Sequence, residues 1–227
     1  MAYEGAGGTG RAGLYCRARR MNSLALSSDT GYTGYMKTGE RFFFIAGSPA
    51  LCFVDTVGDR AGEGNERLTG PEALRDWLVA AGLLADETSR VTDRHLTQAR
   101  ALREAIWRCG RCAIGDRPFD PDDVALINRI AAAPPPRPQL GRGGLYQVAD
   151  RPVAAALSVL AEDAVHLFGS PRKARIRQCP GCAMLFVDTS RPGRRRWCSS
   201  ASGCGNRAKV RRSRARRQSA EAGGARR

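Results

Sequence analysis

Four cysteines near the C-terminal end of this 227-residue chain have a spacing that suits metal binding. They form the pattern C-x2-C-x15-C-x5-C, with Cys179, Cys182, Cys198 and Cys204 as its members. Four thiolates can surround one zinc ion tetrahedrally, and such a closed site leaves no position open for catalysis. Because nothing in the chain looks secreted, a cysteine cluster favours metal over disulfides. The spacing therefore predicts a structural site for Zn2+, with disulfides or unrelated thiols as the alternative.

The residues around these cysteines predict a small unit that consists of a knuckle, a β-hairpin and a helix. Residues 179–182 (CPGC) suit a tight knuckle in which both thiols face one ion. Residues 183–187 are expected to form a strand, and residues 194–198 a second strand that returns beside it. A basic helix is expected from Asn206 onward, with Cys204 at its N-terminus. Since the unit is too small for a core of its own, metal binding is expected to supply its folding energy.

The motifs of this segment resemble the CGNR zinc finger. Residues 204–207 spell CGNR, and the family's RRWC and DTS motifs are present at residues 195–198 and 188–190. In that family the finger follows an N-terminal ABATE domain, and the pair is described as a proposed stress-induced transcription regulator. The resemblance implies a regulator whose body senses a small-molecule effector or forms a homodimer.

The positive charge of the chain is confined to its C-terminal quarter. The formal net charge is +15, and residues 172–227 hold 17 Lys or Arg against two acidic residues. Residues 1–171 hold 20 basic and 20 acidic side chains, so they are neutral overall. A neutral body with a basic finger indicates a polyanionic partner, most simply nucleic acid.

The basic side chains of the finger are the candidates for contact with double-stranded DNA. At 100° per residue, one face of the expected helix carries Arg207, Arg211 and Arg214. The opposite face carries another basic set that includes Lys209 and Arg212. Charge on both faces suits insertion between two rows of phosphates. The predicted nucleic-acid-binding residues are Arg194, Arg195, Arg196, Asn206, Arg207, Lys209, Arg211, Arg212, Arg214, Arg216 and Arg217.

Two alternatives remain open for this basic segment. Asn206 and Arg207 either read base edges from the start of the helix or brace the zinc loop through hydrogen bonds. The partner could also be RNA or the ribosome, or the segment could be a solvated basic tail. Phe186 and Trp197 are expected to pack over the zinc rather than form a stacking platform, which disfavours single-strand recognition.

The fold class predicted for the chain is α+β, with a mixed α/β N-terminal domain followed by the four-cysteine finger. Strands are expected at residues 42–46 and 51–57, joined by a turn at Gly47-Ser48-Pro49, and at residues 145–148. Helices are expected over residues 71–82 with Thr69 as cap, over 93–112, after a cap at Asp120, and over Pro152–Phe168. Residues 131–144 are rich in proline and glycine and predict a loop.

The predicted organisation has four parts. They are a disordered segment at residues 1–38, an ABATE-like domain at 39–170, the zinc finger at 171–217 and a disordered basic tail at 218–227. No apolar run is long enough to span a membrane, and no signal peptide is evident, so a cytoplasmic protein is expected.

No enzyme signature stands out, and no catalytic residue is predicted. ABATE domains typically carry an L-D-F-x-N-T-like signature, which here reads LCFVDT at residues 51–56. Asp55 is therefore a weak candidate for ligand binding, with a structural cap as the alternative. Cys109 and Cys112 form a second C-x2-C, which would suit a thiol redox enzyme, although buried structural thiols fit a helical position better. His95 and His166 are expected to be structural.

Overall fold

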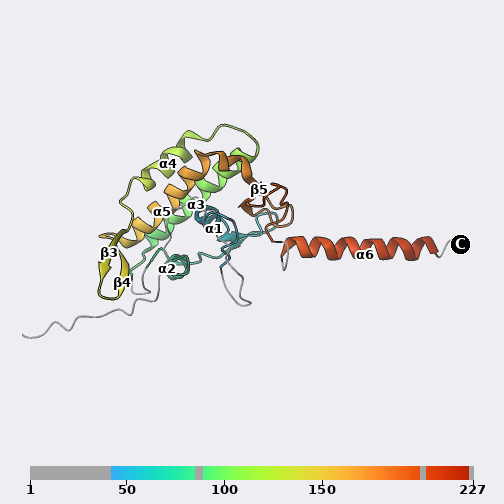
Figure 1. Cartoon of the computed structure of the whole chain (residues 1–227), viewed down its shortest axis with the longest axis horizontal. Helices are drawn as coiled ribbons and strands as arrows, with labels where there is room; N and C mark the ends of the chain where they lie inside the picture. The colour runs from blue at the N-terminus through green and yellow to red at the C-terminus, as the bar shows by residue number, and fades with distance from the viewer. Residues whose placement is uncertain (1–41, 85–88, 200–202, 225–227) are drawn as a thin grey trace, which may run out of the picture.

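The computed structural model describes residues 42–84, 89–199 and 203–224. Within these ranges the chain is α+β, with a helical body, a small finger and a long C-terminal helix that projects away from both (Figure 1). The segment predicted to be disordered at residues 1–38 lies outside the described residues. None of the described helices is both long enough and apolar enough to cross a membrane. The helices are α1 (Pro49–Val54), α2 (Pro71–Ala80), α3 (Asp93–Ile114), α4 (Pro121–Ala131), α5 (Pro152–Phe168) and α6 (Cys204–Gly224), with a 3-10 turn η1 (Pro171–Arg175).

The body is built around α3, α4 and α5, which pack against one another. Helix α1 packs on both α3 and α5, and α2 packs on α3. The predicted helices at these places are confirmed. Asp120 caps α4 by accepting the N–H of Asp122 at 2.8 Å. The N-cap residue of α2 is Gly70 and not Thr69, which was predicted.

His95 has the structural role that was predicted for it. Its N–H donates to Thr92 Oγ1 at 3.4 Å, and the N–H of Thr92 donates to His95 Nδ1 at 3.2 Å. This reciprocal capping box satisfies two N–H groups that the first turn of α3 would otherwise leave unpaired.

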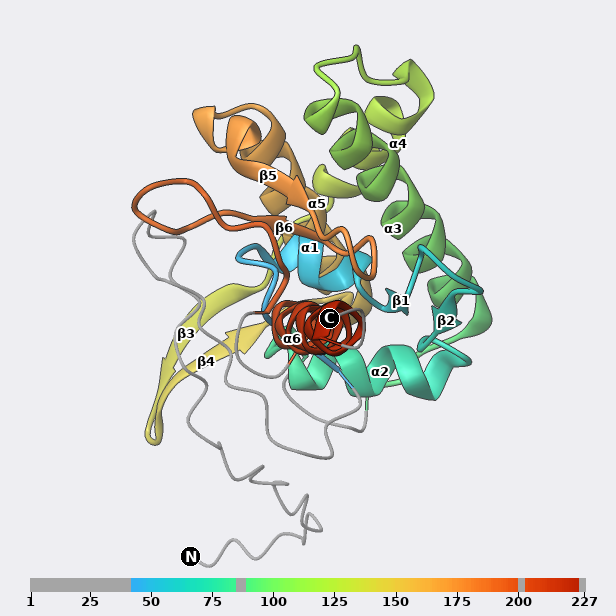
Figure 2. The ribbon, with the colours of Figure 1, turned by 90° about the vertical axis from the view of Figure 1, so that its right-hand side faces the viewer.

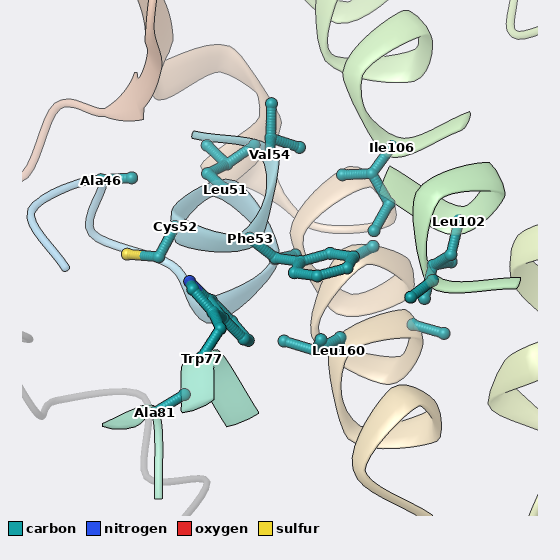
Figure 3. Close-up of a cluster of buried hydrophobic side chains, with 14 of the residues drawn as sticks. Ala46, Leu51, Cys52, Phe53, Val54, Trp77, Ala81, Leu102, Ile106 and Leu160 are labelled. Atoms are coloured by element: carbon teal, nitrogen blue, oxygen red, sulfur yellow. The ribbon is translucent and has the colours of Figure 1, made fainter. Parts of the chain in front are cut away.

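The core of the body is centred on α1, although it is the shortest α-helix described. Phe53 of α1 points toward α3 and α5, where Leu102, Ile106 and Leu160 surround it (Figure 3). Its ring also packs against Trp77 of α2, with 4.9 Å between the ring centroids. Every face of α1 is buried, from Ala50 to Val54.

The strand predicted at residues 51–57 is wrong, because residues 49–54 form helix α1. No strand is assigned at residues 42–46 either. A fully buried apolar run has no alternation of polar and apolar side chains, so its composition does not distinguish a strand from a short helix. Contacts with a residue far away in the sequence stabilise this helix. The carboxylate of Asp163 in α5 accepts hydrogen bonds from the N–H of Ala50, at 2.9 Å, and from the hydroxyl of Ser48.

The described strands form three separate two-stranded antiparallel sheets. They pair β1 (Val57–Gly58) with β2 (Asn65–Glu66), β3 (Arg137–Gly141) with β4 (Gly144–Val148), and β5 (Ile176–Gln178) with β6 (Leu185–Val187). Strand β4 confirms the strand predicted at residues 145–148. Strand β3 lies in the proline-rich segment that was predicted to be a loop.

The finger has a hairpin, but its strands differ from those predicted. Strand β6 matches residues 183–187, yet its partner is β5 and not residues 194–198, which form no strand. The cysteine knuckle lies in the turn between β5 and β6. There the N–H of Cys179 donates to Met184 O, and the N–H of Ala183 donates to Cys179 O, both at 2.9 Å. The knuckle thus closes a hairpin with a strand that precedes the first cysteine.

Strand β6 also joins the finger to the body. The N–H of Val187 donates to Ala46 O at 2.7 Å. The side chain of Leu185 approaches α3 so closely that a Cβ on Gly110 would lie 2.6 Å from Leu185 Cδ1. Leu185 and Val187 share one face of β6, so both pack on the body. The sequence boundary predicted at residue 170 therefore divides two segments that share one hydrophobic core.

Candidate metal centre and basic helix

The four predicted zinc ligands lie together in the structure. Their sulfur atoms are all within 4.8 Å of one another, and Cys182 Sγ lies 3.6 Å from Cys198 Sγ. Zinc bonds thiolate sulfur at about 2.3 Å, so a tetrahedral Zn(Cys)4 site has sulfur atoms about 3.8 Å apart. Cys179, Cys198 and Cys204 are buried and Cys182 is half-buried. The geometry and the donor set fit one zinc ion with no position open for a substrate.

Three separate segments bring these thiols together. The knuckle supplies Cys179 and Cys182, the segment after β6 supplies Cys198, and Cys204 is the first residue of α6. Gly181 allows a close approach where the knuckle meets α6, because a Cβ there would lie 3.1 Å from both Cys204 Cβ and Cys204 Sγ. Metal binding at this point anchors the N-terminus of α6 to the hairpin.

The pKa values of Cys179 and Cys182 are shifted in opposite directions. Burial opposes ionisation of Cys179, but the N–H groups of Cys198, Gly181 and Cys182 hold its pKa at about 7, below the usual value. The adjacent Cys198 thiol and burial together raise the pKa of Cys182. Binding of zinc by these thiols would release their protons, so metal binding is expected to depend on pH.

Asp188, in the DTS motif, organises the turn behind the metal site. Its Oδ1 accepts the N–H of Ser190 at 2.9 Å and the Ser190 hydroxyl at 2.6 Å, and its Oδ2 accepts the N–H of Arg195 at 3.0 Å. Arg175 donates to the carbonyls of Asp188 and Ser190 at 2.9 and 2.7 Å. The sequence resemblance included this motif, whereas the role of Arg175 carried no signal in the sequence.

Arg195, in the RRWC motif, holds the segment that carries the third ligand. Its guanidinium donates to Trp197 O at 2.9 Å and to Cys198 O. It also lies over the ring of Phe186, 4.6 Å from the centroid. These contacts occupy a side chain that was predicted to contact nucleic acid, so in this structure Arg195 acts as a brace.

Arg207, in the CGNR motif, contacts a metal ligand directly. Its Nη2 lies 3.0 Å from Cys204 Sγ, and this thiol raises the pKa of Arg207. A guanidinium hydrogen-bonded to sulfur stabilises the thiolate and orients it, as partners outside the ligand shell do in metal sites. Of the two roles predicted for Arg207, this arrangement favours the brace. Asn206 beside it is exposed.

The other predicted nucleic-acid-binding residues point to solvent. Arg194 and Arg196 are exposed on either side of Arg195. From Lys209 to Gln218 every residue of α6 is exposed, and even Val210 is 40% exposed. Figure 2 looks almost along the axis of α6, which stands out from the finger toward the viewer. Within the described part of the chain, α6 thus presents basic side chains on all sides.

Asp55 lies in a network of charges in the body rather than at a strand end. It is the C-cap of α1, and its carboxylate lies 3.5 Å from Arg67. Burial raises the pKa of Asp55 to about 7, against the effect of Arg67 and Arg60. Nearby, buried Arg103 binds both oxygens of Glu66 at 2.7 Å, a pair that sequence reasoning missed. The placement of Asp55 is consistent with the structural alternative.

The second C-x2-C motif lies near the end of α3, and its cysteines are not among the four clustered thiols. Cys109 is buried, and burial raises the pKa of its thiol to about 12. A thiol with such a pKa is almost fully protonated at neutral pH and is a poor nucleophile. This finding favours a packing role for Cys109. His166 is exposed on α5.

Comparison with known protein families identifies both parts of the chain. Residues 47–171, more than half of the sequence, match the ABATE family, described as "Putative stress-induced transcription regulator". Residues 175–217 match the CGNR zinc finger. No curated protein matches the chain. Neither family is described as enzymatic. The chain therefore belongs to the ABATE family and carries a C-terminal CGNR zinc finger whose four cysteines bind Zn2+.

Proposed function

We propose that this protein is a zinc-dependent DNA-binding transcription regulator that contacts duplex DNA through α6 and through the exposed side chains of Arg194 and Arg196. The observation that carries the proposal is the projecting helix. Six basic residues, from Lys209 to Arg217, lie on the exposed part of a helix whose first residue is a zinc ligand. A solvated tail would not need such an anchor.

The length of α6 suits a groove of DNA. The helix has 21 residues, which corresponds to about 31 Å at 1.5 Å per residue. The major groove admits a single α-helix, and phosphates line both of its edges. Basic side chains on all faces of α6 could then contact phosphates on both sides, while the zinc and Arg207 fix the direction of the helix.

The residues that recognise bases differ from those that contact phosphates. Because Arg207 is engaged with Cys204 Sγ, we assign it to bracing the metal site. Exposed Asn206 stays the candidate for reading a base edge at the start of α6. In this proposal, replacement of Asn206 by Ala changes base preference and leaves the zinc content intact.

Salt dependence tests whether phosphate contacts drive binding. Each contact contributes about 0.9 to the slope of log affinity against log salt, so about five or six contacts give a slope near −5. Replacing Arg212 and Arg216 with Ala should weaken binding to all duplexes alike and flatten the slope by about two. The matched control removes two exposed arginines of the body, Arg117 and Arg129, and should leave the slope unchanged. If the affinity of the parent protein for duplex DNA does not change with salt concentration, the proposal is overturned.

Selection from a random pool of duplexes distinguishes a regulator from a generic polyanion binder. Enrichment of one sequence by the zinc-loaded protein supports specific DNA binding, whereas stronger retention of RNA in a competition assay favours the RNA or ribosome alternative. We also propose that the protein is cytoplasmic. The body would act as the ligand-sensing or dimerisation part of the regulator, with a small-molecule effector still to be identified.

A further inference from the structure

The β3–β4 hairpin projects from the body (Figures 1 and 2). It exposes apolar side chains. Leu140 is 86% exposed, and its cross-strand partner Leu145 is 52% exposed. In the described part of the chain, β3 and β4 pair only with each other. An isolated two-stranded ribbon is marginally stable in water, so this hairpin has two strand edges on which a partner could add.

The register of the hairpin shows which backbone groups face outward. Gly141 pairs with Gly144 across a two-residue loop, and the pair that flanks such a loop exchanges both of its hydrogen bonds. Hydrogen-bonded and non-hydrogen-bonded pairs then alternate along the ladder. The backbone groups that point away from the other strand are therefore those of Leu140, Leu145, Pro138 and Gln147. The position of Pro138 agrees with this assignment, because a proline has no N–H to offer the ladder.

The two outer edges are therefore not equivalent. The β3 edge lacks an N–H at Pro138 and follows three consecutive prolines at residues 134–136, and proline on an edge strand blocks further pairing. The β4 edge offers both N–H and C=O at Leu145 and at Gln147. Among the described residues, one edge is thus closed to a further strand and the other is open.

We propose that the open edge of β4 pairs antiparallel with β4 of a second copy of this chain, which gives a four-stranded sheet in the order β3-β4-β4-β3. The register follows from the outward groups. Leu145 of each copy pairs with Gln147 of the other, so that four backbone hydrogen bonds form and Tyr146 lies opposite its own counterpart. Aromatic residues that face each other across strands stabilise a sheet.

Charge complementarity supports the same register. With Tyr146 at the two-fold axis, Arg142 in the hairpin loop of one copy comes near Asp150, which follows β4 in the other copy, at both ends of the interface. Both side chains are exposed, and Asp150 makes an ion pair only at the surface, with Arg137 at 3.3 Å. Strand β4 itself carries no charge, so pairing brings no like charges together.

The difference between the edges also limits the size of the assembly. Pairing of β4 with itself is isologous, because the same surface is used by both copies, and such contacts close at a dimer. The proline-blocked β3 edge prevents further addition. The dimer does not depend on the DNA-binding proposal, although it would give the assembly two α6 helices. Since β4 has only five residues, association is expected to be weak and to depend on protein concentration.

Sedimentation velocity of the zinc-loaded full chain, without nucleic acid, tests the proposal. The parent should shift from monomer to dimer as its concentration rises. Leu145→Pro removes an outward N–H from β4, one in each copy, and should weaken the dimer by about tenfold or more. The matched control is Leu140→Pro, which removes the outward N–H of the directly opposite residue from the β3 edge and should leave the dimer intact.

Charge reversal keeps the test decisive if either proline unfolds the hairpin. Asp150→Arg should weaken the dimer by placing two arginines near each other. Adding Arg142→Asp to that variant restores opposite charges across the interface and should recover the dimer. A parent that stays monomeric, a parent that grows beyond a dimer, a Leu145→Pro variant that dimerises normally, or a charge swap without recovery would each overturn the proposal.

Discussion

Replacing Leu185 with Ala should destabilise the whole chain and not only the zinc finger. Leu185 lies on the finger strand β6, is 1% exposed, and packs against Gly110 of α3. Truncating a buried leucine costs about 2–5 kcal/mol, with the larger values where the cavity cannot collapse. Gly110 has no side chain that could fill the space. We therefore expect a loss of about 3 kcal/mol, which lowers Tm by roughly 6–12 °C for a chain of this size.

Two signals followed during heating separate a shared core from an independent finger. Circular dichroism at 222 nm reports mainly on the helices of the body, and a colorimetric chelator reports the release of zinc. In the parent both transitions should coincide, and Leu185→Ala should lower both together. The control is Val210→Ala on exposed α6, which should change stability by less than about 0.5 kcal/mol. A shift confined to zinc release would refute the shared core.

The close approach of Leu185 to Gly110 provides a second, more specific test. In the parent, Gly110→Ala would place its Cβ 2.6 Å from Leu185 Cδ1, so the side chain of Leu185 must move. In the Leu185→Ala background the same methyl group enters the vacated space. Contacting residues typically show coupling energies of about 0.5–3 kcal/mol in such cycles. Additive effects of the two substitutions would show that β6 does not pack on α3 as described.

Two further predictions concern the metal site and the buried acid. Cys182→Ser or Cys198→Ser should abolish the single bound zinc, measured by metal analysis, while Cys112→Ser keeps it; full zinc in either ligand variant would contradict the assignment. Burial raises the pKa of Asp55 from 3.8 to about 7, so the folded chain retains a proton that the unfolded chain has already released. The contribution of this proton to the free energy of unfolding is fully present below about pH 4 and is lost as the pH rises toward 7. Between pH 5.5 and 7.5, the free energy of unfolding should therefore fall less in Asp55→Asn than in the parent, measured by denaturant unfolding with zinc in excess. An equal fall in both proteins would exclude the effect.

The metal site was predictable because its chemistry is local to a few residue types. Cysteines at this spacing have few alternative uses in a chain without secretory features, so Cys179 and Cys204 could be assigned before their distance was known. Helix α4 was predictable for a similar reason, since Asp120 marks its start two residues before the N–H group that it satisfies. These signals depend on near neighbours in the sequence.

The parts that could not be predicted depend on contacts between distant residues. Helix α1 is stabilised by Asp163, which is 113 residues from Ala50, and its apolar sequence also suits a buried strand. The pairing of β6 with β5 depends on the knuckle that closes between them. The role of Arg195 could not be read from composition, because a basic side chain beside other basic side chains looks like a phosphate contact until its carbonyl partners are known.

The shared core gives the proposed regulator a physical route between its two parts. Phe186 and Leu185 are adjacent on β6, so their side chains lie on opposite faces of the strand. Phe186 lies under Arg195, which holds the carbonyl of a zinc ligand, whereas Leu185 packs on α3 of the body. A movement of α3 would therefore act on the strand that supports the metal site, and the metal site fixes the start of α6. A body that changes shape on binding an effector or a second copy could alter the direction of the basic helix without contacting it.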